Sequence, residues 1–556
     1  MVNARFFALG GLDENGKNSY VLEIDNNIYI INCGTKVPIT YSHGIDILIP
    51  NFQYLIDQRK RIKGVFITDI QNESFSALPW LVMDIPQIPI FCSQFSKYPI
   101  LERMSKYNID QKNINVNIIP KEGIKFKDDN VIVKPIPVAG ALPGTIGFAF
   151  ITKEGDNYLF LANLVDGNLG VYGKTDLLKI KKDYPNINAL ILDCGMANFN
   201  GKSSEKISIK KELNQIFKET PETERIIIGA YDQEMVSLQQ VLDLAKKYNR
   251  AVVTYGRSYY QLLTLLKKSQ PSLDLPEILD YRAISNHNQN IVVIVTGTVE
   301  RLFKRFIRIT ENNDVYLKLN KKDHFVMLAP PINGLETEST YALDEIARIT
   351  PKITDVAEDK FYRCRPTKQD IIDIVKTLNP NYFIPIQGLF RYLSVAIRSV
   401  VQSGYSQNKC ILLQNGKVAH FKGKELITQK ERISQVGDTI VDGFGVGDIS
   451  KEVIFERETL ARDGVIITSI MINKETKKLY NNFSIRYIGV ISLQERETID
   501  ELITNLIKEI YYKALNTLQQ KFSLTQIQTT LKKSIRKKIF KKTDKEPMVV
   551  ISFNEV

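Results

Sequence analysis

The sequence predicts an α/β protein made of several domains. Between residues 64 and 200, and again between 226 and 258, apolar segments typical of strands alternate with short helical segments, the order expected of layered α/β folds. A chain of 556 residues is too long for one hydrophobic core, so three to four domains are expected. Hydrophobic residues make up 44% and charged residues 24%, an ordinary globular balance.

The N-terminal segment, residues 4–33, alternates in the manner of β-strands, with turn sequences at 10–11, 14–16 and 25–27. The next segment, GVFITDIQNESFSALPW (64–80), predicts a buried strand that ends at Thr68, then a polar loop, then a helix that begins near residue 77. A loop at the carboxyl end of a strand is where α/β proteins usually place their chemistry. This loop is therefore the first candidate site.

Further elements follow in order. Residues 226–258 predict strand, turn, helix and strand, and Thr367 to Asp370 form a capping-box start for a helix that stops before Pro380. Residues 422–436 are charged and unpatterned, which indicates a linker. Two C-terminal helices each show one apolar face. Those faces consist of Ile499, Leu502, Ile503, Leu506 and Ile510, and of Leu524, Ile527, Leu531, Ile535 and Ile539.

Charge suggests a class of partner. The net charge of +12 and the pI near 9.1 fit a polyanion, most commonly nucleic acid, and fit equally a lysine-rich surface that serves solubility. The basic run at 532–542 on the second C-terminal helix could touch RNA, although a solvated helix face is the more common role.

The expected location is the cytoplasm, without membrane association. No apolar run is long enough to span a bilayer, and the N-terminus lacks the features of a signal peptide. Five cysteines lie far apart without a C-x-x-C pair, which is typical of reduced thiols.

Several segments, taken in order along the whole chain, resemble the RNase J branch of the metallo-β-lactamase fold. They include GGLDENGKNSYVLE (10–23), Thr68 and Ala77-Leu78-Pro79 around the candidate loop, PVAGALPGTIGFAF (137–150), NYLFLANLVDG (157–167), LILDCG (190–195) and NYFIPIQGLFRYL (381–393). The resemblance implies an αββα sandwich with an inserted β-CASP α/β domain and a small α+β C-terminal domain. The expected boundaries are 1–204 and 351–421 for the two parts of the sandwich, 205–350 for the β-CASP domain, 422–439 for the linker and 440–556 for a C-terminal oligomerisation domain.

The ligands of the family's metal centre are missing from the matching positions. The family holds two zinc or manganese ions with five histidines and two aspartates. The positions that correspond here are Asp69, Gln71, Glu73, Ser74, Gly140, Asn163 and Gln387. All four histidines lie outside residues 44–286, where four of the family's five would fall, so no realignment supplies them. We therefore expect no catalytic residue and no bound metal or other cofactor.

A different kind of metal site remains an alternative. Asp69 and Glu73 could hold Mg²⁺ or Ca²⁺, which prefer oxygen ligands. Two carboxylates on one loop are more often solvated turn residues or charges at a helix N-terminus.

The resemblance also suggests residues that contact RNA. Arg363 and Arg365 fall in a family segment that grips RNA phosphates, and Arg365 replaces a histidine. Arginines there could clamp phosphate. The favoured alternative is that they pair with Asp69, Glu73 or Asp193, because carboxylates that have lost a metal need counter-charge. The predicted RNA-binding set is Arg257, Ser258, Arg363, Arg365 and Lys368, although Gly256 to Ser258 fit equally a turn with a conformational glycine and a packing serine. A further segment, 301–308, mixes basic residues with Phe303 and Phe306, which could face nucleic acid or belong to the core.

These observations lead to a functional hypothesis. The resemblance implies a role in mRNA decay and rRNA maturation, and the missing ligands imply a catalytically inactive subunit. We expect it to assemble with an active RNase J paralogue, as a hetero- or homo-oligomer, and to help bind RNA. Two alternatives are an active 5′–3′ exo- or endoribonuclease with unorthodox metal ligands, and an interaction scaffold that makes no contact with RNA.

Overall fold

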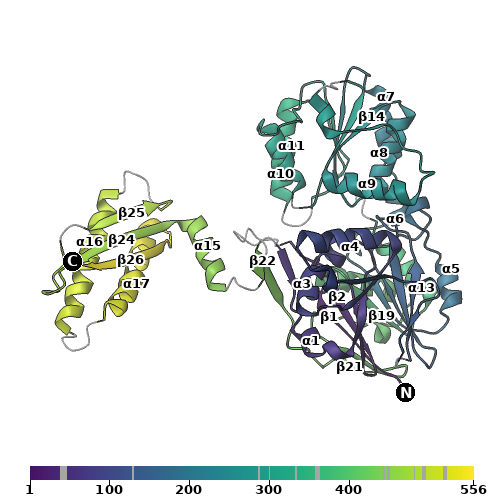
Figure 1. Cartoon of the computed structure of the whole chain (residues 1–556), viewed down its shortest axis with the longest axis horizontal. Coiled ribbons are helices and arrows are strands. Elements are labelled where there is room, and N and C mark those ends of the chain that lie inside the picture. Colours follow the sequence, from purple (N-terminus) through teal and green to yellow (C-terminus); the bar gives the residue numbers. More distant parts are fainter. Residues whose placement is uncertain are drawn as a thin grey trace. The chain divides into compact units, whose positions relative to one another are not determined.

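The chain folds into two compact units, one within residues 1–439 and one that begins at Ile440 (Figure 1). The computed structural model describes residues 1–37, 47–127, 130–285, 289–299, 301–331, 335–356, 364–442, 445–446, 451–480, 483–490, 496–517 and 523–556. Within these ranges every helix is too short or too polar to span a lipid bilayer.

The first sheet of the larger unit has eight strands, in the order β21-β20-β1-β2-β3-β5-β6-β7. They are β1 (Asn3–Gly10), β2 (Ser19–Ile24), β3 (Asn27–Ile31), β5 (Ile62–Phe66), β6 (Pro89–Cys92), β7 (Asn115–Ile118), β20 (Ala419–Lys422) and β21 (Glu425–Thr428). The strands from β1 to β3 are antiparallel, whereas those from β3 to β7 are parallel. Asp25, with a φ of +51°, allows the tight turn between β2 and β3. The strands predicted at the N-terminus are present.

The second sheet has six strands, in the order β19-β12-β11-β10-β9-β8. They are β8 (Ile124–Lys125), β9 (Ile132–Pro137), β10 (Ile146–Ile151), β11 (Asn157–Leu161), β12 (Ile187–Asp193) and β19 (Tyr382–Ile386). The adjacent strands β11, β12 and β19 are parallel, so their carboxyl ends lie at one edge of the sheet.

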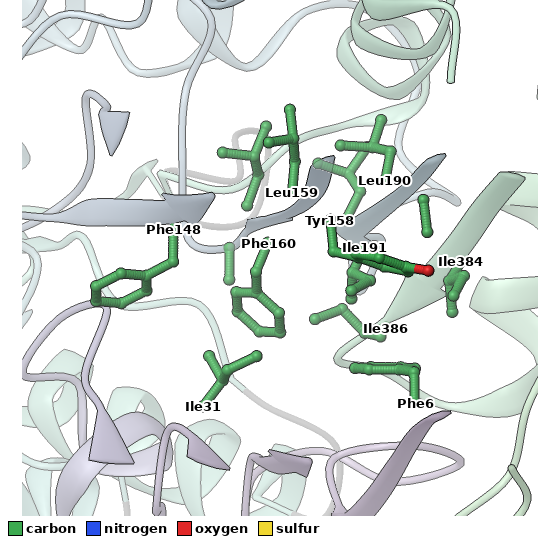
Figure 2. Close-up of a cluster of buried hydrophobic side chains, with 14 of the residues drawn as sticks. Phe6, Ile31, Phe148, Tyr158, Leu159, Phe160, Leu190, Ile191, Ile384 and Ile386 are labelled. Atoms are coloured by element: carbon green, nitrogen blue, oxygen red, sulfur yellow. The ribbon is translucent and has the colours of Figure 1, made fainter. Parts of the chain in front are cut away.

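The two sheets pack face to face through aromatic and aliphatic side chains. The rings of Tyr20 and Phe160 lie 5.3 Å apart and those of Tyr29 and Phe150 lie 5.4 Å apart, each pair joining one sheet to the other. Figure 2 shows this shared core. Helices cover the outer faces: α3 (Leu78–Asp84) and α4 (Gln94–Lys106) on one side, and α5 (Leu177–Asp183), α13 (Lys368–Leu378) and α14 (Phe390–Gln402) on the other. The predicted αββα sandwich is confirmed.

Shorter elements complete the sandwich. They are β4 (Ile47–Pro50), α1 (Gln53–Asp57) and α2 (Asn72–Phe75). The predicted capping box is also present, because the Asp370 carboxylate accepts a hydrogen bond from the Thr367 backbone N–H at 2.9 Å. The helix that it starts ends at Leu378, before Pro380 as predicted.

Residues 194–381 are inserted between β12 and β19, which are neighbours in the second sheet. Apart from α13, which covers the sandwich, they form a third, parallel sheet with its helices, in the strand order β15-β14-β16-β13-β17-β18. Its strands are β13 (Ile226–Tyr231), β14 (Ala251–Tyr255), β15 (Ile278–Leu279), β16 (Ile291–Gly297), β17 (His324–Met327) and β18 (Ile353–Asp355). Its helices are α6 (Ser203–Lys206), α7 (Lys210–Glu219), α8 (Met235–Lys247), α9 (Arg257–Ser269), α10 (Leu302–Thr310) and α11 (Glu336–Ile349). The sheet thus extends past residue 350, the predicted end of this domain.

The smaller unit is an α+β domain. It contains α15 (Lys451–Asp463), a three-stranded sheet in the order β25-β24-β26, and two long helices. The sheet strands are β24 (Val465–Ile472), β25 (Ser484–Ile488) and β26 (Met548–Glu555), and the helices are α16 (Arg496–Thr517) and α17 (Leu524–Thr543). A hairpin of β22 (Asp438–Asp442) and β23 (Gly445–Val446) precedes α15 in the chain. Ile499, Ile503, Ile527 and Leu531 lie in the core of this unit, and the predicted face residues Leu502, Ile510 and Leu524 pack against it partly buried, so both predicted apolar faces turn toward the core.

The predicted linker, 422–439, needs a correction. Residues Glu425–Thr428 form β21, which pairs with β20 at the edge of the eight-stranded sheet. An edge strand that alternates exposed and half-buried residues lacks a strong apolar pattern, so its sequence resembles that of a linker.

Candidate functional site

The candidate site lies where strands of both sheets of the sandwich end. Asp69 follows β5 of the first sheet, while Asn163 follows β11, Asp193 ends β12 and Gln387 follows β19. The last three strands are parallel neighbours, so the topology itself places these residues together. Side-chain hydrogen bonds from Asn163 to Asp69 and from Gln387 to Glu73 join the two groups.

Asp69 is buried, with 1% of its surface exposed. Its carboxylate accepts hydrogen bonds from the Thr68 hydroxyl at 2.7 Å, the Gln71 backbone N–H at 2.8 Å and the Asn163 amide at 2.9 Å. Burial raises the pKa of Asp69 above its usual value, and the hydrogen bonds oppose this only in part. The carboxylate therefore has neutral donors around it, with no cation in hydrogen-bond contact among the described residues.

Two amide side chains continue the network. The Asn163 side-chain amide also donates to the Ser74 hydroxyl at 3.3 Å, and the Gln387 side-chain amide donates to the Asn163 side-chain oxygen Oδ1 at 2.7 Å and to the Glu73 carboxylate at 3.2 Å. An amide carries both donor and acceptor, so Asn163 can link Asp69 to Gln387 directly. Side-chain hydrogen bonds thus join five of the seven positions that correspond to metal ligands, namely Asp69, Glu73, Ser74, Asn163 and Gln387, and a sixth, Gln71, joins through its backbone N–H.

Arg365 supplies the positive charge of the cluster. Its guanidinium donates to both oxygens of Asp193, at 2.8 and 2.6 Å, and to the Gln387 backbone carbonyl at 2.7 Å. The Nη1 atom of Arg365 lies 3.9 Å from the Oε1 atom of Glu73. Burial acts to lower the pKa of Arg365, but the charge and hydrogen bonds of Asp193 outweigh it and hold that pKa above its usual value. Of the two roles predicted for Arg365, the ion pair with a carboxylate is present, and phosphate binding stays a prediction.

The position of Gly140 has no space for a larger side chain. A Cβ at Gly140 would lie 2.6 Å from the Thr145 hydroxyl oxygen and 2.9 Å from the backbone carbonyl oxygen of Asn163. The Thr145 hydroxyl is itself held by the Leu142 carbonyl at 2.8 Å. Surrounding atoms therefore fill the space that a ligand side chain would need.

Two residues of the cluster have a left-handed backbone. Asn163 has a φ of +51° and Gln387 a φ of +66°. Asparagine tolerates this conformation, but it is unusual for glutamine, and such strain concentrates at functional sites. The Gln387 backbone N–H is fixed by a hydrogen bond to the Gly11 carbonyl at 3.0 Å.

The donor set does not fit the two-metal centre that the fold family implies. Zinc and manganese sites need imidazole and carboxylate ligands in fixed geometry. Here the amides of Asn163 and Gln387 direct N–H groups at Asp69 and Glu73, and Arg365 engages both oxygens of Asp193. In the part of the chain that the structure describes, no three His, Cys, Asp or Glu side chains are grouped to hold a metal ion.

Of the other predicted RNA-binding residues, the three that the structure describes, Arg257, Ser258 and Lys368, are not hydrogen-bonded to this network. Arg257 and Ser258 are exposed at the start of α9, after β14. Lys368 begins α13, and its ammonium donates to the Asn200 side chain at 2.7 Å. Arg363 lies outside the described residues. The RNA-binding roles of all these residues stay predictions.

The ambiguity at 301–308 is resolved. Phe303 and Phe306 lie on the buried face of α10, are 1% and 0% exposed, and belong to the core of the inserted domain. Burial of both rings leaves them unable to stack on a base, so they are core residues.

One residue of the site region carried no signal in the sequence. Gln233, just after β13 of the inserted domain, donates to the Ile70 carbonyl at 2.8 Å and accepts from the Asn72 backbone N–H at 3.3 Å. Its side chain thus clamps the backbone of the loop that carries Asp69, Gln71, Glu73 and Ser74. A single glutamine 163 residues away along the chain has no pattern that could reveal this contact.

Comparisons with known proteins agree with this architecture. Residues 223–346 match the family described as "Ribonuclease J, beta-CASP domain", and residues 452–556 match "Ribonuclease J C-terminal domain". "Uncharacterized protein MG423" of Mycoplasma genitalium is 27% identical over 575 residues, covering 99% of each chain. "Ribonuclease J 2" of Staphylococcus saprophyticus is 23% identical over 559 residues, covering 100% of this chain and 98% of the relative. A solved structure of a protein of unknown function from Enterococcus faecalis V583 matches 76% of this chain and all of its own, with a TM-score of 0.50 and 13% identity.

Proposed function

This chain belongs to the ribonuclease J family, and we propose that within the family it is a non-catalytic subunit that acts in RNA processing. It would assemble with an active ribonuclease J paralogue and contribute to RNA binding. The C-terminal domain would serve in that assembly. Its place in mRNA decay and rRNA maturation, and its presence in the cytoplasm, are part of the same proposal.

The observation that carries the proposal is the network between Asp69, Asn163 and Gln387. A two-metal hydrolase holds its ions roughly 3.5–4 Å apart so that a bridging water can be ionised and can attack phosphorus. That arrangement requires lone pairs directed at the ions. Here the carboxylates of Asp69 and Glu73 use lone pairs to accept N–H groups, from Asn163 at 2.9 Å and from Gln387 at 3.2 Å. The amide groups of Asn163 and Gln387 thus present N–H groups where metal ligands would present lone pairs.

Arg365 supports the same proposal. A guanidinium in bidentate contact with Asp193 provides the counter-charge that a buried carboxylate needs. A metal ion next to Asp193 would have to displace this group, which is 6% exposed and so has little access to water. The ion pair therefore gives Asp193 its counter-charge without a metal ion.

The test is a metal analysis and a nuclease assay on the purified chain, free of any paralogue. The substrate is a 5′-monophosphorylated RNA, with and without added Mn²⁺. We expect no stoichiometric metal and no cleavage under either condition. Cleavage that Asp69→Ala or Glu73→Ala abolishes would overturn the proposal in favour of an active nuclease with unorthodox ligands.

RNA contact is tested separately, through the dependence of binding on salt. Each phosphate contact on single-stranded RNA contributes about 0.7 to the slope of log affinity against log salt concentration. We expect a clearly negative slope. A slope near zero would instead favour a scaffold that makes no contact with RNA.

A further inference from the structure

The smaller unit concentrates positive charge on one helix. α17 carries seven basic residues and no acidic ones, namely Lys532, Lys533, Arg536, Lys537, Lys538, Lys541 and Lys542. Its partner α16 carries both signs, with four acidic and three basic residues. The charge is therefore a property of α17 and not of the domain as a whole.

The orientation of α17 is fixed by its apolar side. Ile527, Leu531, Ile535 and Ile539 are at most 3% exposed and pack in the core of the unit. The opposite side has the spacing i, i+3, i+4, i+7 and i+8 and lies along one line of the helix. That line consists of Lys533, Arg536, Lys537, Phe540 and Lys541, and we call it the basic line of α17.

Almost none of this charge is neutralised within the chain. Among the described residues, Arg536 alone of the seven basic side chains has an ion-pair partner, Glu546 at 3.5 Å. Lys533, Lys537 and Lys541 are exposed. Ammonium groups held this close on one face repel one another, and a polyanion relieves that repulsion.

An aromatic ring lies within the basic line. Phe540 is 44% exposed, between Lys537 one turn before it and Lys541 directly after it. Proteins that bind single-stranded nucleic acid combine such cations, which follow the backbone, with aromatic rings on which bases stack.

We propose that the basic line of α17 binds the phosphate backbone of single-stranded RNA, with Phe540 stacking on a base. The proposal deepens the function given above, from which it takes RNA as the polyanion, and it assigns the contact to the C-terminal domain.

Two other partners fit the surface less well. A helix that lies on a membrane inserts its apolar face between lipids, and in α17 that face is already buried in the core. Protein interfaces are depleted in lysine, whereas the basic line has lysine at three of its five positions. RNA requires neither a free apolar face nor a lysine-poor centre.

The experiment compares the full-length protein with two charge-matched triple variants. Lys533→Gln/Lys537→Gln/Lys541→Gln neutralises the basic line. Lys153→Gln/Lys474→Gln/Lys478→Gln removes the same charge from other exposed positions and is the control. Binding of a fluorescent single-stranded RNA is measured over a range of salt concentrations, and thermal unfolding confirms that both variants fold.

We expect the basic-line variant to bind more weakly than the control on every RNA sequence tested, with the salt slope reduced by about 2. Phe540→Leu is expected to weaken binding of single-stranded RNA about tenfold while sparing double-stranded RNA, because only unpaired bases can stack on the ring.

Equal affinity and equal salt slope for the two triple variants would overturn the proposal, and would leave the proposed function standing if the wild-type protein binds RNA. A wild-type protein with a salt slope near zero would overturn both. Binding to phosphatidylserine vesicles that the basic-line variant loses, while its RNA binding is unchanged, would also overturn the proposal and assign the surface to a membrane.

Discussion

The guanidinium of Arg365 meets both carboxylate oxygens of Asp193, at 2.8 and 2.6 Å, inside the sandwich domain. The two residues lie 172 positions apart in the sequence and on opposite sides of the inserted domain. Their pairing ties the second part of the sandwich to the first at the candidate site.

Arg365→Ala is expected to destabilise the larger unit by about 3–5 kcal/mol, because it leaves Asp193 as an uncompensated buried charge. Urea unfolding of the wild-type and variant proteins measures this difference. The double variant Arg365→Ala/Asp193→Asn is expected to recover part of the loss, since it removes the stranded charge. A loss below about 1 kcal/mol for Arg365→Ala would show that the pair is not structurally important.

Gly140→His is expected to destabilise the protein by about 1–3 kcal/mol, because the new Cβ meets Thr145 and the Asn163 backbone. Gly437→His is the matched control, since a Cβ at that position meets nothing within 4 Å. Thermal unfolding distinguishes the two. Equal unfolding temperatures would mean that the site can open to admit a side chain.

Gln233→Ala is expected to loosen the loop that carries Asp69, because the two hydrogen bonds to Ile70 and Asn72 are lost. Hydrogen exchange of the loop amides should become faster while exchange in the strands is unchanged. Gln215→Ala removes a glutamine whose side chain hydrogen-bonds the exposed Glu219 on the same helix, and it serves as the control. Unaltered exchange in the loop would refute the clamp.

The stability of the protein is expected to depend on His324 below neutral pH. Burial lowers the pKa of His324 below its ordinary value of 6.5, and the charge of Lys352 lowers it further. The unfolded chain therefore takes up the proton more readily than the folded one. The contribution of neutral His324 is complete above pH 6.5 and is lost as the pH falls through the lower, folded-state pKa.

The measurement is the unfolding temperature of the wild type and of His324→Asn between pH 5 and 8. The wild type should lose more stability than the variant as the pH falls. Parallel curves for the two proteins would contradict the assignment.

The order of the domains and the sandwich could be predicted from the sequence because many segments of the chain resemble ribonuclease J segments and follow in the same order. Pairing of Arg365 with a carboxylate was foreseen as one of two roles, since buried carboxylates need counter-charge. That Arg365 pairs with Asp193 could be seen only from the contact between their side chains in the structure. The clamp by Gln233 could not be foreseen, because an amide that bonds to backbone groups needs no partner of defined type. β21 could not be predicted for a related reason. A strand at a sheet edge buries too few side chains to show an apolar pattern in the sequence.

The cluster around Asp69 has an electrostatic consequence for any RNA that reaches it. Asp69, Glu73 and Asp193 carry three potential negative charges, and Arg365 supplies one positive charge, which is hydrogen-bonded to Asp193 and lies 3.9 Å from Glu73. With all three carboxyl groups ionised, the formal sum is −3 + 1 = −2, so an approaching phosphate would be repelled. In such a subunit the RNA would be held by positively charged surfaces outside this centre. The subunit would then guide RNA without binding it at the centre.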